Sequence, residues 1–371
     1  MFDNNSGEGS VQSLSLFKPI PMNIPEALIV FSNDWHLKKE NIDEITDLVR
    51  QQCILAKELN AKYLACLGDI FDSRVAQRQE VLDAFSEILD MIKEYDIELW
   101  AIPGNHDKTV YTSYKSFLTA YKYHPNFKLI IIAGSLPFVK EGISLHFLPF
   151  FKEEMWVEEY NAFAGYIGNM DEAKHILCTH IAVTGSRNND GTMVTSTLSS
   201  KLFKDFYKVF SGHYHDQQKI GENFYHLPSI QQNNFGENSD KGFTVLYSDG
   251  SHQLFRSKFK EFIKVKIDLE QLEDGELTLL AKKYQNSSDN IRFEITGPEN
   301  SLKSLCKEDF TSIGIDIKTK CKEIEDDIIF AESEDIKEHT KDSIKEEFSE
   351  FCVKENLNHA QGFKYLIKKL N

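Results

Sequence analysis

The sequence has no long apolar run, which bears on where the protein is found. None of its runs approaches the roughly 18 apolar residues that a membrane-spanning helix needs. The first residues, MFDNNSGEGSVQSLSLFKPIPMN, lack the basic start and the apolar middle of a secretory signal. We therefore expect a soluble cytoplasmic protein with no membrane partner, and a flexible leader over residues 1–26.

Closely spaced cysteine pairs are also missing, although the chain has six cysteines. No two of them form a C-x-x-C pair, and several lie within apolar runs. The pattern favours buried free thiols in a reducing compartment over disulfides or a cysteine-bound metal. The six are Cys53, Cys66, Cys178, Cys306, Cys321 and Cys352.

Positive charge is scarce, and the formal net charge is −16. This balance argues against a surface that binds nucleic acid everywhere by neutralising phosphates. It leaves room for a local site at which bound cations supply the positive charge. The chain also has no G-x-x-x-x-G-K-[ST] motif, so any ATP-driven step has to come from another protein.

The length of 371 residues favours one large domain and a smaller one. Apolar runs and helical stripes alternate over residues 27–256, which predicts an α/β domain built as a two-sheet β-sandwich flanked by helices. Helices are expected over residues 41–60 and 79–95. Strands are expected over residues 28–31, 63–67, 98–102, 128–133, 143–148, 175–179, 207–211, 224–227 and 243–247.

The composition changes after Arg256. Strand-like segments at 262–269, 290–295 and 314–318 alternate with helical ones at 272–284 and 301–306, which predicts a small α+β cap over residues 257–320. Residues 321–341 are strongly acidic and are expected to form a solvated linker. Residues 342–371 have the pattern of two amphipathic helices.

Five groups of candidate ligands directly follow predicted strands, where sites gather in α/β folds. Taken singly, each has an ordinary explanation, such as a surface histidine, a Gly-Asn turn or a helix-capping aspartate. Together they offer oxygen and nitrogen ligands suited to Mn, Fe or Zn, which favours a metal site. The groups are Asp34 with His36; Asp69 with Asp72; Asn105 with His106; His180; and His213 with His215.

Within this set, the residue types suggest different tasks. One carboxylate has two oxygens, so Asp69 could bridge two cations, and Gly68 leaves space beside it. Asn105 offers a neutral oxygen, with His106 as a proton donor next to it. The remaining histidines have no other candidate ligands near them in the sequence and are assigned no chemical role.

The order D-x-H, GDIFD, GNHD, a strand-borne His180 and GHYH resembles the calcineurin-like metallophosphoesterases. Within them, the chain looks most similar to the Mre11/SbcD nucleases, a group that includes the recombination endonuclease subunit of T-even-like phages. The segments GDIFDSR, IPGNHDK, FLPF, VFSGHYH and FGENSDKGF carry this likeness. It spans about Leu28 to Phe255, and beyond Arg256 only the layout is similar.

The resemblance implies a site for two divalent metal ions, most readily Mn, with Mg, Fe or Zn as alternatives. It implies that His106 is the general acid or stabilises the transition state, and that Asp72 lies behind the ligands. One metal would be held by Asp34, His36, Asp69 and His215, and the other by Asp69, Asn105, His180 and His213.

The resemblance also implies a DNA exonuclease and endonuclease of repair and recombination, working as a homodimer with an SMC-like ATPase of the Rad50/SbcC type. The cap would contact DNA. The terminal helices would dock on the coiled coil of the ATPase, or else pack on their own domain. Candidate phosphate contacts in the main domain are Lys38, Lys39, Arg74 and Arg187.

Two other functions fit parts of the pattern. A phosphodiesterase or phosphatase acting on nucleotides or other small phosphate esters would use the same metals, and the acidic net charge favours it. A non-catalytic scaffold would share the fold, but the intact ligand motifs argue against it. The cap and the terminal helices favour the nuclease.

Overall fold

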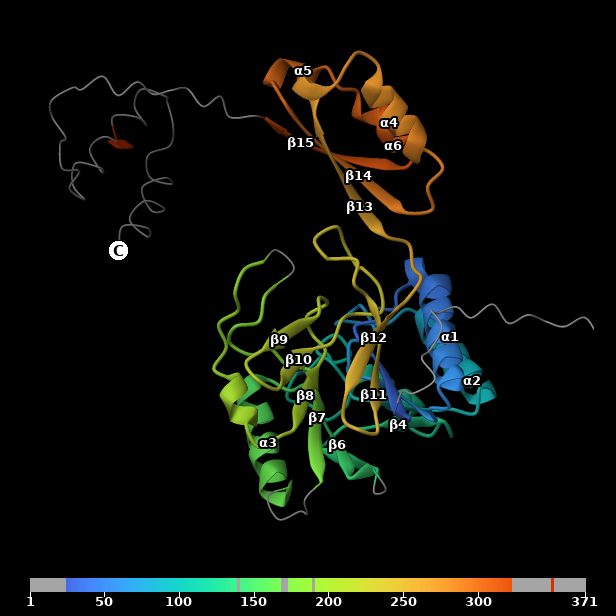
Figure 1. Cartoon of the computed structure of the whole chain (residues 1–371), viewed down its shortest axis with the longest axis vertical. Helices are drawn as coiled ribbons and strands as arrows, with labels where there is room; N and C mark the ends of the chain where they lie inside the picture. The colour runs from blue at the N-terminus through green and yellow to red at the C-terminus, as the bar shows by residue number, and fades with distance from the viewer. Residues whose placement is uncertain (1–24, 139–140, 168–172, 189–190, 322–347, 350–371) are drawn as a thin grey trace, which may run out of the picture. The chain divides into compact units, whose positions relative to one another are not determined.

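The computed structural model describes residues 25–138, 141–167, 173–188, 191–321 and 348–349 (Figure 1). The chain divides into two compact units, Met1–Cys321 and Lys322–Asn371. The expected leader, acidic linker and terminal helices lie outside the described residues, apart from residues 25, 26, 321, 348 and 349. Among the helices of the described ranges, none has the length and apolar character needed to cross a membrane.

The first sheet has six strands in the order β12-β11-β1-β2-β3-β4. Strands β1 to β4 run parallel, whereas β11 pairs antiparallel with both β1 and β12. The strands are β1 (Ala27–Ser32), β2 (Tyr63–Cys66), β3 (Glu98–Ala101), β4 (Phe127–Leu129), β11 (Gly242–Tyr247) and β12 (His252–Arg256).

The second sheet also has six strands, in the order β5-β6-β7-β8-β10-β9. Its four central strands are parallel, and the two edge strands are antiparallel to their neighbours. The strands are β5 (Gly134–Phe138), β6 (Ile143–Leu148), β7 (Lys174–Thr179), β8 (Lys208–Ser211), β9 (Gln218–Ile220) and β10 (Phe224–His226).

The two sheets pack face to face across an apolar core, as the contact between Phe31 of β1 and Phe210 of β8 shows. Helices α1 (Ile42–Glu58) and α2 (Gln79–Glu94) cover the outer face of the first sheet, and α3 (Glu153–Ile167) packs against the second (Figure 1). The α/β sandwich flanked by helices is therefore confirmed.

Every residue of strand β1 before Ser32 is apolar, and the packing of the strand explains why. Ala27 and Val30 pack toward the helices, whereas Leu28, Ile29 and Phe31 pack toward the second sheet. A parallel strand with both faces covered needs apolar residues at every position. The helical stripe over residues 41–60 likewise matches α1, which buries Ile45, Leu48 and Val49 against the sheet.

The strand expected over residues 128–133 exists as β4, but its expected end is wrong. Strand β4 ends at Leu129, and Ile130 makes one more bond, from its N–H to the carbonyl of Ala101, before the chain leaves the sheet. The apolar run that follows is a crossing to the second sheet, with Ile132 exposed. Helix α3 and strands β5, β9 and β12 were not expected.

The cap is a sheet of three parallel strands in the order β13-β14-β15. Three helices pack on one face of this sheet around Phe293 and Phe310. The elements are β13 (Phe262–Asp268), α4 (Glu276–Tyr284), β14 (Asn290–Gly297), α5 (Glu299–Lys303), α6 (Lys307–Thr311) and β15 (Ile315–Cys321).

The replacement Phe85→Ala tests the packing beneath the loops that leave β1 and β2. The Phe85 ring is fully buried and has edge contacts with Trp35 and Phe71, which lie in those loops. Removing it should lower the free energy of unfolding by about 3–5 kcal/mol, measured by urea denaturation. Val75→Ala, at a residue 82% exposed, should change it by less than about 0.5 kcal/mol. A loss below about 1 kcal/mol for Phe85→Ala would contradict this packing.

Candidate metal centre

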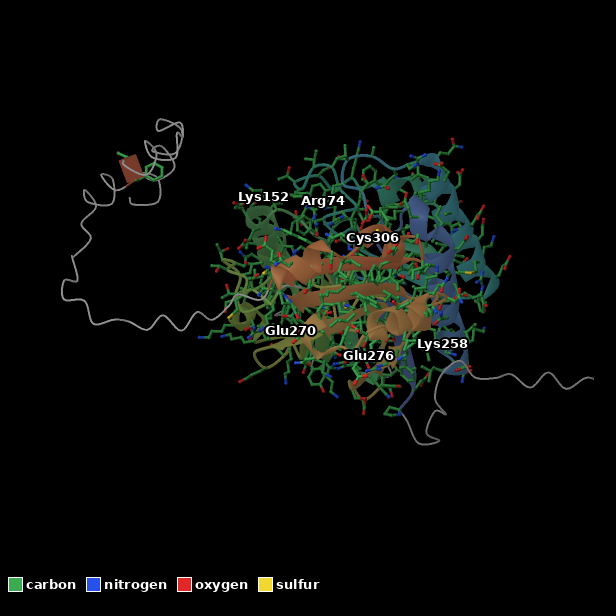
Figure 2. The ribbon with its side chains drawn as sticks, turned by 90° about the horizontal axis from the view of Figure 1, so that it is seen from above. Arg74, Lys152, Lys258, Glu270, Glu276 and Cys306 are labelled. Carbon is green, nitrogen blue, oxygen red and sulfur yellow. The ribbon has the colours of Figure 1, made fainter. Side chains whose placement is uncertain are left out.

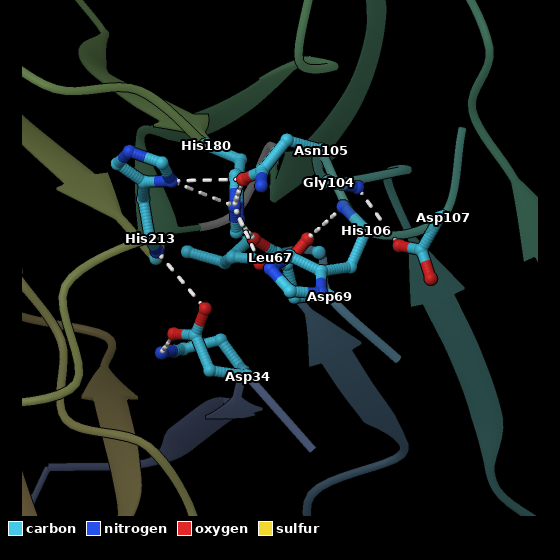
Figure 3. A network of polar contacts seen from close by, with 12 residues as sticks. Asp34, Leu67, Asp69, Gly104, Asn105, His106, Asp107, His180 and His213 are labelled. Carbon is cyan, nitrogen blue, oxygen red and sulfur yellow. Dashed lines mark hydrogen bonds and ion pairs between the residues drawn. The ribbon is translucent and has the colours of Figure 1, made fainter. Parts of the chain in front are cut away.

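The carboxyl ends of five strands, three from the first sheet and two from the second, bring the candidate ligands together. Figure 3 shows one ligand from each strand end: Asp34, Asp69, Asn105, His180 and His213. Such strand ends are where open α/β sheets commonly bind ligands. Each ligand follows the end of its strand within one to four residues, so little chain separates the ligand from the rigid sheet. The ligands follow β1 (Asp34, His36), β2 (Asp69), β3 (Asn105), β7 (His180) and β8 (His213, His215).

One group of ligands consists of Asp34, His36 and His215, whose ligand atoms all lie within 4.8 Å of one another. The Nε2 atoms of His36 and His215 face each other at 3.0 Å. Two imidazole nitrogens at this distance need a proton or a cation between them. Asp34 also accepts a hydrogen bond from the backbone N–H of His213 at 3.1 Å, which joins β1 to β8.

A second group consists of Asp69, His180 and His213, with Asn105 between the two histidines. The Oδ1 atom of Asn105 lies 3.0 Å from Nε2 of His180 and 2.9 Å from Nδ1 of His213. Nε2 of His180 lies 3.3 Å from Oδ2 of Asp69. Asp69 also lies within 4.8 Å of His36 and His106, so it stands between the two groups, as a bridging ligand would.

The surroundings of two histidines fix which nitrogen faces the centre. Nδ1–H of His180 donates to the carbonyl of Leu67 at 2.6 Å, and Nδ1–H of His215 donates to Oε1 of Glu237 at 2.8 Å. In its neutral form, each ring therefore presents the lone pair of Nε2 to the centre. Such outer hydrogen bonds orient metal-binding histidines and raise their basicity.

Sequence reasoning missed Glu237 as a functional residue. Its buried carboxylate binds His215, accepts the backbone N–H of Asn233 at 3.1 Å and pairs with buried Lys241 at 3.0 Å. Burial would raise the pKa of Glu237, but His215 and Lys241 lower it, so the group is ionised. The segment FGENSDKGF was used only as a likeness, because nothing local ties Glu237 to a histidine 22 positions away.

Asp107 was also missed. Its carboxylate accepts the backbone N–H groups of Gly104 at 2.8 Å and Phe71 at 3.0 Å, so it ties the loop after β3 to the loop after β2. Burial, followed by the charge of Asp69, raises the pKa of Asp107 to about 6. Asp107 is thus a structural support placed directly behind the ligand loops.

The electrostatics of the site favour cations. Burial alone would lower the pKa of His180, but the charge of Asp69 and its hydrogen bond raise it to about 9. A proton on His180 therefore compensates Asp69 at neutral pH, and a cation binding there displaces it. Buried carboxylate, imidazole and amide oxygen together form a donor set suited to Mn, Fe or Zn.

The backbone is strained at four of the ligands. Asp34, His36, Asp69 and His213 have φ between 48° and 83°, in the left-handed region. Only two other non-glycine residues of the described chain, Asn60 and Asp96, share this feature. Such conformations are costly for non-glycine residues and cluster at functional sites. The strain is consistent with a backbone shaped around bound ions.

Three glycines permit the close approach of the strand ends. A Cβ atom on Gly104 would overlap Oδ1 of Asp69, and one on Gly68 would lie 2.5 Å from Nδ1 of His180. A Cβ atom on Gly212 would lie 2.9 Å from the same nitrogen. The motifs GD, GNHD and GHYH therefore carry glycine where a side chain would push a ligand away.

His106 and Arg74 lie at the rim of the centre. The Nδ1–H of His106 donates to the carbonyl of Asp72 at 2.5 Å, and Nη2 of Arg74 donates to Nε2 of His106 at 2.6 Å. Burial lowers the pKa of His106; Asp69 opposes this, but His36 and Arg74 add to it. The Asp72 carboxylate lies 3.5 Å from Nδ1 of His36, behind that ligand.

These residues border a cleft of about 620 Å³. Lys38 and Arg74 line it, whereas Lys39 pairs with Glu80 at 3.6 Å and Arg187 donates to the carbonyl of Gly191, and neither lines the cleft. The lining consists of His36, Lys38, Asp69, Asp72, Arg74, Asn105, His106, Asn188, His213, Tyr214, His215 and Asn233.

The replacement Gly104→Ala tests the close approach at this site. The added Cβ displaces the Asp69 carboxylate, so the affinity for Mn should fall about 10-fold or more, as for other losses of ligand orientation. Isothermal titration with Mn measures the effect. Gly165→Ala in α3, where a Cβ meets nothing within 4 Å, is the matched control and should bind Mn normally. Unchanged Mn affinity in Gly104→Ala would show that Asp69 is not a ligand.

Comparison with known proteins identifies the family. The calcineurin-like phosphoesterase family matches residues 27–217. A relative from Invertebrate iridescent virus 6, named "Putative phosphoesterase 244L", is 23% identical over an alignment of 300 residues, which covers 75% of this chain and 97% of that protein.

Solved structures give lower similarity. A dimetal phosphatase from Danio rerio matches 60% of this chain and 93% of its own, at 12% identity and a TM-score of 0.37. Nuclease MPE from Pseudomonas putida matches 55% of this chain and 69% of its own, at 13% identity and a TM-score of 0.27.

The family match spans more than half of the chain, and it includes every strand end that supplies a ligand. The ligand atoms converge in two groups around Asp69, in keeping with a dinuclear site. The chain therefore belongs to the calcineurin-like phosphoesterases, a family of hydrolases that use dinuclear metal sites.

Proposed function

We propose that this phosphoesterase is a metal-dependent DNA nuclease, acting as exonuclease and endonuclease in a repair and recombination complex of the Mre11–Rad50/SbcCD type. The motif order over residues 28–255 supports this reading. The cap is the observation that favours DNA over a small phosphate ester as the substrate, because hydrolysis of a small ester needs no such addition to the metallophosphoesterase domain.

The cap sheet has one apolar face and one charged face. Ile263, Val265 and Ile267 of β13 pack with the helices, so the residues between them lie on the opposite face. Cationic side chains outnumber anionic ones on that face, in a chain whose net charge is −16. The cations are Lys264, Lys266, Arg292, Lys318 and Lys320, and the anions are Asp268, Glu294 and Asp316.

The strand register places two cations and one anion in each of two rows across the sheet. Lys264 and Arg292 share a row with Asp316, which pairs with Arg292 at 2.6 Å, and Lys266 and Lys318 lie on either side of Glu294. Figure 2 shows the cap with its side chains, where Glu276 marks the start of α4 on the helical side. The excess of cations on this face suits the phosphates of DNA, whose neutralisation supplies most non-specific affinity.

The metal centre has cations of its own for a phosphodiester. Lys38 and Arg74 line the cleft beside the ligands, so each can contact a phosphate next to the scissile one. Arg74 donates to His106 and to the hydroxyl of Tyr111. A bound phosphate oxygen that took the place of His106 as the partner of Arg74 would leave Nε2 of His106 free to contact the substrate.

The chemistry divides between the ions and the chain. Two divalent ions, most readily Mn, would supply an acidified water and neutralise the charge that develops on the phosphate. Asp34, Asp69, Asn105 and the four histidines of the two ligand groups would hold them. His106, at the rim and oriented by the carbonyl of Asp72, would stabilise or protonate the leaving oxygen through a proton on Nε2.

The proposal extends to partners. An SMC-like ATPase of the Rad50/SbcC type would supply the ATP-driven step, because the sequence contains no P-loop. A second copy of the chain would complete a homodimer. Residues 342–371, the expected docking segment, lie outside the described residues apart from residues 348 and 349.

A second function has one observation in its favour. The net charge of −16 suits a phosphodiesterase or phosphatase that acts on nucleotides or other small phosphate esters. Such an enzyme would use the same metal centre, and the cationic face of the cap would then have no role in catalysis.

A cleavage assay with two substrate classes separates the functions. With Mn, the protein should cut linear duplex or single-stranded DNA, and Lys264→Glu/Lys266→Glu should weaken DNA binding by about 10-fold at moderate salt. Hydrolysis of a small aryl phosphodiester should be unaffected by that variant. Lys282→Glu/Lys283→Glu, on the exposed surface of α4, is the matched control. Brisk hydrolysis of the small ester without cleavage of any DNA would favour the alternative.

His106→Ala tests the role of the rim histidine. Loss of its contact with the leaving oxygen should lower kcat by about 10²–10⁴-fold, while the protein keeps its Mn. Stopped-assay kinetics measure the first effect, and metal analysis of the purified variant measures the second. A variant that loses Mn along with activity would show that His106 is a ligand instead.

A further inference from the structure

A second cavity, of about 260 Å³, lies directly beside the metal centre. Its lining is mostly apolar and comes from loops after β3, β6 and β7 and from residues 194–198. His213, which belongs to the second ligand group, lines both this cavity and the metal cleft. The cavity therefore opens where a group attached to the bound phosphate would reach it.

Phe150 forms the aromatic wall between the cavity and the ligands. Its ring lies nearly parallel to His213, with an interplanar angle of 22° and centroids 6.4 Å apart. It meets His180 edge-on, with centroids 6.2 Å apart. The backbone N–H of Phe150 donates to the carbonyl of Pro103 at 3.0 Å, which fixes this residue beside the ligand loop.

Tyr111 lines the cavity together with Phe150, and their rings meet edge-on with centroids 5.2 Å apart. The Tyr111 hydroxyl accepts a hydrogen bond from Nη1 of Arg74 at 3.4 Å, while Nη2 of Arg74 binds His106. A continuous set of contacts thus runs from the rim of the metal cleft to the aromatic wall of the cavity.

We propose that this cavity holds an unpaired nucleobase next to the scissile phosphate, with Phe150 as the stacking surface. An apolar cavity with a fixed aromatic wall gains most from a flat ring, because every base offers a π-face for stacking. Phosphate in the metal cleft and base in the cavity are the two ends of one nucleotide. The exposed Thr195 gives the lining a polar group for the base edge, whereas the hydroxyl of Ser196 already bonds Glu153 and the carbonyl of Ala182.

This inference rests on the proposed action on DNA, and it makes the substrate more specific. A base that is stacked and paired within a duplex cannot enter a side cavity, so it has to leave the helix first. Unstacking costs least at frayed ends, mismatches and single strands. The cavity thus favours cleavage beside unpaired nucleotides over cleavage within intact duplex.

Binding of two phosphates that differ only in the base tests the cavity. Thymidine 5′-monophosphate and deoxyribose 5-phosphate are titrated separately into the Mn-loaded protein by calorimetry. The wild type should bind the nucleotide about 10-fold or more tightly than the sugar phosphate. The ratio of the two affinities removes any effect on the metal centre, because both ligands carry the same phosphate.

Four variants complete the test. Phe150→Ala should bring the ratio close to one, and Phe150→Tyr, which keeps the ring, should preserve it. Ala182→Phe fills the cavity from a different wall and should also bring the affinity ratio close to one. It is an independent test in case Phe150→Ala misfolds. Tyr123→Ala, at an aromatic residue 86% exposed, is the control.

A wild-type ratio close to one, or a high ratio that survives both Phe150→Ala and Ala182→Phe, would overturn the assignment. The ratio does not depend on cleavage. A protein that shows the expected ratio but cuts no DNA would retain the base site and refute only the nuclease function.

Discussion

Asp69 is a buried carboxylate shared by two groups of ligands, and its charge is the constraint that the surrounding residues satisfy. Its Oδ1 atom accepts the backbone N–H of His106, and its Oδ2 atom faces His180. A charge withdrawn from water in this way needs compensation nearby. His180 supplies it through a shared proton, and cations supply it when bound. Glycine at position 104 and the support of Asp107 keep this carboxylate in place.

The sandwich architecture explains how one carboxylate can serve both groups. The first sheet supplies Asp34, Asp69 and Asn105, and the second supplies His180 and His213. Because the sheets pack through Phe31 and Phe210 and related residues, their strand ends meet along one edge. The apolar core thereby sets the distance between ligands that are remote in the sequence.

The sequence could propose these ligands because each lies close to a buried strand, and a short apolar run is a local signal. It did not predict Glu237, Asp107 or Phe150, since their roles arise only when remote loops meet. The strand prediction ran past Leu129 for a related reason, because the apolar segment that starts at Ile130 and crosses between the sheets has the pattern of a strand. Lys39 and Arg187 were proposed from charge alone, and the structure places neither in the cleft lining. The local sequence pattern therefore indicates candidate ligands, whereas the residues that support them become apparent only from tertiary contacts.

Anomalous diffraction from crystals soaked in Mn tests the central claim most directly. The account predicts two anomalous peaks that share Asp69, one bounded by Asp34, His36 and His215 and the other by Asn105, His180 and His213. The absence of any peak, or a single peak that does not touch Asp69, would contradict the bridged centre.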